Sequence, residues 1–243
     1  MSYLVDGYHG ETVASAPASE RVAFIRRTYA HLAGAVLAFV GIETVLLSSG
    51  LGLELFRSIF AGGGSMAWLG LMVLFIVGGI GAQMMARSRQ SVGVQYAGLT
   101  LYVLLEVVIF LPILIVATQA PQYAGKDLPL QAGIVTLAAF AGLTIAVFTS
   151  GKDFSFLGPI LWVGAFLGLA MVIAALIGGF SLGLGFAAMM VALACGFIIY
   201  DTSNIIHHYG TDQHVSAALQ LFASVALLFW YVLRIFMSVS SDD

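Results

Sequence analysis

The chain has 243 residues, of which 60% are hydrophobic and 9% are charged, and its net charge is −3. Soluble domains are about 45–50% apolar and about 25% charged, so this composition excludes a soluble globular protein. The small, evenly spread charge also argues against a nucleic-acid-binding protein. The single cysteine, Cys195, excludes an intramolecular disulfide and a cysteine-based metal site.

Seven stretches of the sequence are apolar over about 20 residues, the length at which a helix crosses a bilayer. In chain order they cover residues 29–49, 66–86, 95–118, 130–149, 157–178, 181–206 and 215–237. Segments of this length satisfy their own backbone polar groups inside a membrane only as helices. The sequence therefore predicts an all-α membrane protein. Its parts are a polar segment at 1–28, one seven-helix transmembrane bundle at 29–237 and a short polar tail at 238–243.

The cations indicate how the bundle is oriented. Six fall on one predicted side: Arg21, Arg26, Arg27, Arg87, Arg89 and Lys152. Three fall on the other: Arg57, Lys126 and Arg234. Cytoplasmic loops carry an excess of Lys and Arg, so the N-terminus is predicted to be cytoplasmic and the C-terminus to lie outside.

The stretch GFIIYDTSNIIHHYG, residues 196–210, places an acid near the inner end of the sixth span. A charge inside a span costs at least about 2–3 kcal/mol unless it is hydrated or paired. Asn204 and His208 follow Asp201 at i+3 and i+7, on the same helical face. Asp201 is therefore either the partner of a polar neighbour near the membrane surface or a titratable gate facing a water-filled cavity. His207 and His208 either modulate such a site or are solvated loop residues.

Two further acids and one base fall inside predicted spans. Glu106 lies near the middle of the third span, and it either lines a pathway or makes a structural hydrogen bond to another helix. Glu43 lies in the outer part of the first span, and Arg234 lies at comparable depth in the seventh. These two residues either form an ion pair that latches the helices together, or Arg234 extends to the outer membrane surface.

Several other classes of membrane protein lack their diagnostic residues here. A retinal protein needs a lysine within a helix, but Lys126 and Lys152 are both in predicted loops. The sequence contains neither a Walker A nor an HExxH motif. His207, His208 and His214 match a metal cluster only in number. No spacing pairs a nucleophile with a base, so the sequence predicts neither an enzyme nor a bound cofactor.

Two sequence blocks carry a resemblance to a known family. FTSGKDFSFLGPIL, residues 148–161, is followed by YDTSNIIHHYG, residues 200–210. Together with RTYAHLAGAVL near the start and a proline in the third span, they resemble the Bax inhibitor-1 family, also called the transmembrane Bax inhibitor motif family. The resemblance extends over essentially the whole chain and is greatest to the bacterial inner-membrane branch.

The resemblance implies a seven-helix fold with the last helix at its centre, and a pH-sensitive calcium leak. In eukaryotes it also implies suppression of cell death. The family's proton and calcium switch uses two aspartates, in the sixth and seventh helices. Asp201 matches the first, whereas Ser224 stands at the second, so one carboxylate is missing. Counting about 1.5 Å per residue puts the two positions roughly 12 and 16 Å from the turn between their helices. They can therefore face each other, and Glu106 is a candidate for the lost carboxylate.

Two functions remain open from the sequence. The first is a pH-modulated cation leak channel that carries calcium, with Asp201 as a calcium ligand. The alternative is a non-conducting regulator that binds other membrane proteins, such as a membrane protease. The expected partners are the lipid bilayer, protons and calcium, and the expected location is a bacterial inner membrane.

Overall fold

The computed structural model describes residues 12–61, 64–88 and 91–241. Within them the chain forms eight α-helices and two short 3-10 helices. Their bounds are α1 Ala18–Ser49, α2 Leu51–Phe60, α3 Gly64–Ala86, α4 Val92–Gln119, η1 Pro121–Tyr123, α5 Leu128–Ser150, η2 Ser155–Leu157, α6 Gly158–Gly178, α7 Leu184–His207 and α8 His214–Ser241. Seven of the eight α-helices, all except α2, are long and apolar enough to cross a membrane. The predicted all-α bundle of seven spans is therefore confirmed.

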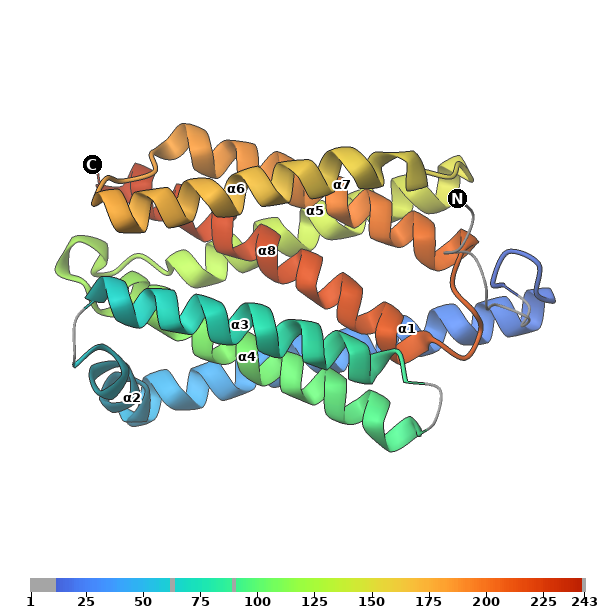
Figure 1. Cartoon of the computed structure of the whole chain (residues 1–243), viewed down its shortest axis with the longest axis horizontal. Coiled ribbons are helices and arrows are strands. Elements are labelled where there is room, and N and C mark those ends of the chain that lie inside the picture. Colours follow the sequence, from blue (N-terminus) through green and yellow to red (C-terminus); the bar gives the residue numbers. More distant parts are fainter. Residues whose placement is uncertain (1–11, 62–63, 89–90, 242–243) are drawn as a thin grey trace.

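The last helix, α8, lies at the centre of the bundle (Figure 1). It packs against α7, α1, α5, α4 and α3, whereas α6 packs on the outer side of α7 and also meets α3. The expectation of a central last helix is thus confirmed. The outward-facing side chains are apolar: Leu37, Ile160 and Ile177 are all at least 70% exposed. Such surfaces are stable in lipid and unfavourable in water.

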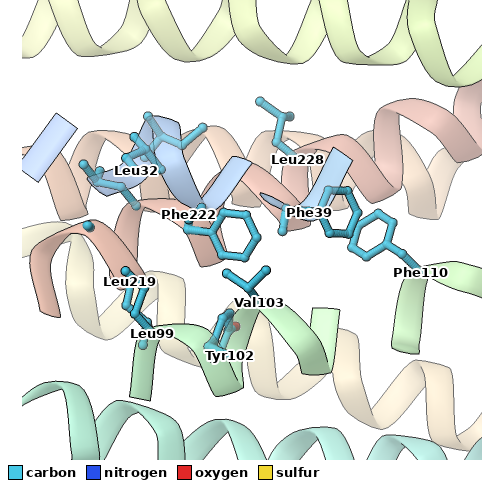
Figure 2. Packing of buried hydrophobic residues seen from close by; sticks show 14 of the residues in the cluster. Leu32, Phe39, Leu99, Tyr102, Val103, Phe110, Leu219, Phe222 and Leu228 are labelled. Carbon is cyan, nitrogen blue, oxygen red and sulfur yellow. The ribbon is translucent and has the colours of Figure 1, made fainter. Parts of the chain in front are cut away.

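Aromatic rings fill the interior between α1, α4 and α8 (Figure 2). Phe39 of α1 meets Phe110 of α4 edge-on, with ring centroids 5.1 Å apart, and it also contacts Phe222 of α8. Tyr102 of α4 packs edge-on against the other side of Phe222, at 6.3 Å. Edge-to-face pairs of this kind contribute about 0.5–1.5 kcal/mol each beyond burial, so the three helices are firmly joined at this level.

The first helix begins earlier than the sequence indicates. It starts at Ala18, directly after Pro17, and not at residue 29. Proline is favoured at this end of a helix because its φ angle is already helical and it has no N–H to leave unpaired. The basic residues before the apolar stretch are therefore helical, although they lower the hydropathy that marks a span. Residues 18–28, which the sequence assigns to a separate polar segment, therefore belong to α1.

A short helix, α2, lies between the first two predicted spans. Gly50 has a φ of +78°, the left-handed conformation that ends many helices, and α2 begins at the next residue. Its sequence LGLELFRSIF alternates apolar and charged residues at helical spacing. Such an amphipathic segment suits the membrane surface, and it is too short to be detected as a span.

The last helix extends through most of the predicted polar tail. α8 continues to Ser241, beyond residue 237, where the apolar stretch ends. The Lys126 ammonium donates a hydrogen bond to the carbonyl oxygen of Ser240 at 2.9 Å. A cation at the C-terminal end of a helix pairs with otherwise unsatisfied carbonyl groups, which explains how the polar last turn stays helical.

Candidate functional site

The antiparallel pair of α7 and α8 brings together the two positions that the sequence places at similar depth. Asp201 of α7 is 2% exposed and Ser224 of α8 is 4% exposed. The Ser224 hydroxyl donates a hydrogen bond to Oδ2 of Asp201. This contact ties α7 to α8 at the depth of Asp201.

Asp201 lies on the wall of a polar cavity of about 430 Å³. The cavity is lined from four helices and the turn between α7 and α8, by Gln83, Arg87, Trp162, Tyr200, Asp201, Asn204, His208, Tyr209, Gln213, Ser216 and Gln220. Ten of these eleven side chains carry a polar group at their tip or ring, and only Trp162 is mainly apolar. A pocket lined mainly by polar side chains therefore reaches a buried carboxyl group at this end of the bundle.

Arg87 is the cation of this cavity. It follows the last residue of α3 and lies close enough to Asp201 for its charge to act on the carboxyl. The amide of Gln220, on α8, also interacts with Asp201. In the sequence Arg87 served only to indicate orientation. The sequence does place Arg87 at the same predicted membrane face as Asp201, and this shared position could have indicated a role for Arg87 in the site.

Of the three residues predicted to modulate the site, two line the cavity and one does not. Asn204 and His208 line the cavity, as their spacing from Asp201 on one helical face suggests. His207 is not among the cavity-lining residues, and its Nδ1 lies 2.9 Å from the carbonyl oxygen of Ser203, one turn earlier. The structure therefore places His208, and not His207, beside the candidate site.

Asp153 physically connects the two sequence blocks that carry the family resemblance. Its Oδ2 lies 3.0 Å from Nε2 of His208, and its Oδ1 accepts hydrogen bonds from the Ser203 hydroxyl at 3.3 Å and the Ser155 N–H at 2.9 Å. The Ser155 N–H is the largest cause that lowers the pKa of Asp153 from 3.8 to about 2. Asp153 therefore stays ionised at all ordinary pH values and anchors the α5–α6 loop to α7. Sequence reasoning did not select this residue.

Glu106 is buried but does not replace the missing carboxylate beside Asp201. It is 4% exposed on α4, and its carboxyl interacts with the hydroxyl of Tyr102, one turn earlier on the same helix. Among the described residues Glu106 makes no hydrogen bond to Asp201, whose hydroxyl partner is Ser224. Tyr102 lies near both acids, close enough for both charges to act on it. Glu106 is thus a neighbour of the site through Tyr102.

The latch between Glu43 and Arg234 is not formed. Glu43 is 3% exposed, and neither of its carboxyl oxygens has a hydrogen-bond partner within the described part of the chain. Arg234 lies near Tyr231 on its own helix. Two side chains at equal depth in a membrane meet only if their helices turn them toward each other, and depth alone does not determine this.

The donors around Asp201 are few for a resident calcium ion. Ca²⁺ takes about six to eight oxygen ligands, usually including several carboxylates. Here one carboxylate is accompanied by neutral oxygens of Ser224 and Gln220. No group of three or more His, Cys, Asp or Glu side chains that could hold a metal occurs among the described residues. The donor set does not fit a tightly held calcium ion.

The fold and this site define an integral membrane protein whose seven-helix bundle holds a buried acid at the end of a polar cavity. A model of the family described as "Inhibitor of apoptosis-promoting Bax1" matches residues 21–241. The chain therefore belongs to the Bax inhibitor-1 family.

Relatives of the chain come from animals, fungi and viruses. Protein lifeguard 4 of Mus musculus is 30% identical over 239 residues, which cover 97% of this chain and 93% of that protein. Golgi anti-apoptotic protein of Vaccinia virus is 28% identical over 241 residues, covering 95% and 91%. Bax inhibitor 1 of Schizosaccharomyces pombe is 31% identical over 119 residues, covering 47% and 44%. No solved structure matches the chain.

Proposed function

We propose that this protein is a proton-modulated cation leak, with calcium as the ion that it conducts. The observation that carries the proposal is the placement of Asp201. A buried carboxyl at the inner end of a polar cavity can attract a cation from water and can also bind a proton. The Asp201 carboxyl therefore serves both as the ion site and as the pH sensor.

The hydrogen bond between Asp201 and Ser224 supports a gate at this level. An ionised Asp201 accepts the Ser224 hydroxyl and attracts Arg87, which holds α7, α8 and α3 together. Protonation removes the charge and with it much of this attraction. The helices then separate more easily, so we expect the leak to increase as the pH falls.

Beyond the cavity the pathway has to pass the aromatic layer. Phe39, Phe110 and Phe222 pack against one another in the interior, and Tyr102 lies between this layer and the two acids. Conduction therefore requires α8 to move relative to α1 and α4. Glu106, next to Tyr102, is the polar group that an ion would meet during this passage.

The small number of oxygen ligands around Asp201 suits ion conduction better than tight ion binding. An ion that binds several carboxylates leaves slowly, whereas a site with one carboxylate and neutral oxygens releases it readily. Calcium is thus the transported ion in this proposal and not a structural one.

We further propose a bacterial inner membrane as the location, with the N-terminus in the cytoplasm. The blocks around Asp153 and Asp201 support the bacterial branch, and the cation excess at the Arg21 and Arg87 end supports the orientation. In this orientation the cavity opens to the cytoplasm.

Calcium flux through purified protein tests the proposal. The chain is reconstituted in liposomes that contain a calcium indicator, and flux is measured from pH 5 to 8. We expect flux that rises as the pH falls, and Asp201→Asn should remove most of the pH response. Asp127→Asn is the control, because Asp127 is an exposed acid just before α5 and is not among the cavity-lining residues.

Two outcomes would contradict the proposal. If folded, monodisperse wild type gives no flux at any pH, the protein is a non-conducting regulator that acts by binding other membrane proteins such as a protease. If Asp201→Asn keeps the wild-type pH profile, the sensor lies elsewhere. A Glu106→Gln variant with normal folded yield should alter the flux if Glu106 lines the path.

A further inference from the structure

A second polar cluster lies where α1, α4 and the start of α8 meet, outside the cavity that contains Asp201. His31 of α1 lies with Nε2 at 3.0 Å from the hydroxyl of Tyr96 on α4. The ring of His214, the first residue of α8, is 5.0 Å from the His31 ring, centroid to centroid. The sequence places His214 close to His207 and His208, whereas the fold sets its ring beside His31.

The hydrogen bonds determine which nitrogen of His31 is free to bind a ligand. Its Nδ1 lies 2.6 Å from the carbonyl oxygen of Arg27. A carbonyl oxygen only accepts, so Nδ1 carries the proton and Nε2 presents its lone pair toward Tyr96. On the other side, Nδ1 of His214 is buried and has no hydrogen-bond partner within the described ranges. The Tyr96 hydroxyl therefore donates to Nε2 of His31, while the neighbouring Nδ1 of His214 has no partner within the described ranges.

We propose that His31, His214 and Tyr96 bind a divalent transition-metal ion, of which Zn²⁺ is the best match. Imidazole nitrogens are the ligands that zinc, copper and nickel prefer. A metal-binding histidine commonly donates its other N–H to a backbone carbonyl, as His31 does to Arg27. The metal takes the place of the present hydrogen bond between His31 and Tyr96 and gives the unpartnered nitrogen of His214 a ligand bond.

The separation of the two rings fits one shared ion. With a Zn–N distance of about 2.0–2.1 Å and tetrahedral angles, the centroids of two bound imidazoles are about 5 Å apart. The observed separation of 5.0 Å between the His31 and His214 rings matches this value. Tyr96 is 40% exposed, so an ion can reach the cluster from outside.

Two opposite charges lie near the cluster. Arg27, one turn before His31 on α1, opposes a cation, whereas Asp212 in the turn before α8 favours it, and both act on His214. The site joins the first turn of the central helix to α1 and α4, so metal binding should stabilise the fold. This inference does not depend on calcium conduction.

Spectroscopy of the metal-free full chain tests the site. Purified protein, freed of any affinity tag and stripped with a chelator, is titrated with Co²⁺, whose visible absorption reports tetrahedral coordination, and the Co²⁺ is then displaced with Zn²⁺. We expect one ion per chain and a Zn²⁺-dependent rise in unfolding temperature. His31→Gln and His214→Gln should each weaken binding at least tenfold, and Tyr96→Phe should change the spectrum. Binding should also weaken between pH 7.5 and 5.5, because the imidazoles must be deprotonated.

The remaining histidines provide the controls. A His207→Gln, His208→Gln double variant leaves the cluster intact and should bind like wild type. The proposal is overturned if this double variant loses the ion, if folded His31→Gln and His214→Gln both bind as tightly as wild type, or if wild type binds no metal. Gel filtration and circular dichroism establish that each variant is folded before it is titrated.

Discussion

Among the described glycines, Gly98 leaves the least room for an added methyl group, so the effect of that group can be predicted. Gly98 of α4 lies against the end of α3. A Cβ atom at Gly98 would be 2.5 Å from the carbonyl oxygen of Ala82 and 2.6 Å from the backbone nitrogen of Ala86. Both atoms belong to the backbone of α3 and cannot rotate away. We therefore expect Gly98→Ala to force the two helices apart.

The cost follows from the size of this shift. Raising the shortest distance from 2.5 Å to the 3.0 Å minimum of real contacts needs a movement of about 0.5 Å. Overpacking costs about 1–3 kcal/mol, and fixed backbone atoms favour the upper end. Alanine gains back about 1 kcal/mol over glycine in a helix. The net destabilisation is thus about 2 kcal/mol, which lowers the unfolding temperature by about 4–8 °C in a chain of this size.

Thermal unfolding in detergent is the assay, with Gly81→Ala as the matched control. Gly81 lies in α3, and a Cβ there would have no atom within 4 Å. The control should unfold at or slightly above the wild-type temperature. If Gly98→Ala is as stable as Gly81→Ala, α3 and α4 are not packed as closely as the structure has them and the reasoning fails.

Three more predictions concern the site and its surroundings. Ser224→Asp restores a carboxylate pair with Asp201, so the flux should depend more steeply on pH and calcium should bind more tightly, whereas the uncharged Ser224→Asn should do neither. If both variants behave alike, the two positions are not in contact. Asp153 has a lowered pKa of about 2, so its stabilisation is present above pH 3.8 and is lost only as the pH falls through 2. In a His208→Gln background, Asp153→Asn should therefore change thermal stability equally at pH 5, 6.5 and 8, and a smaller effect at pH 5 would contradict this. A reporter fused after Asp243 should be active only outside the cytoplasm; a cytoplasmic signal would reverse the proposed orientation.

The number of spans could be predicted from the sequence because hydropathy over a bilayer-length segment depends on composition and not on contacts. The matched depth of Asp201 and Ser224 could be predicted for a similar reason. Each helical residue advances the chain by about 1.5 Å, so counting from a short turn is enough. Ser224 itself was selected through the family resemblance, because a serine in a span carries no signal of its own.

The side that each helix turns to its neighbours was decided only by the tertiary structure. These spans are apolar all round, so the periodicity that marks the buried side of a water-soluble helix is missing. Depth alone suggested Glu43 and Arg234 as a pair, which the fold keeps apart. Because three histidines occur close together in the sequence, His214 could be taken as a neighbour of His207 and His208, whereas the fold sets it against His31.

Arg87 and Asp153 show most directly why the residues around the buried acid could not be predicted from the sequence. Both lie in loops or at helix ends that hydropathy treats as boundaries, and Asp153 meets Ser203 across 50 residues of sequence. The sequence determined how many helices cross the membrane and at what depth a charge is buried. Which groups surround that charge depends on how each helix is rotated about its axis. This rotation is set by close packing over the whole bundle, such as that of α3 against Gly98, and by no single stretch of the chain.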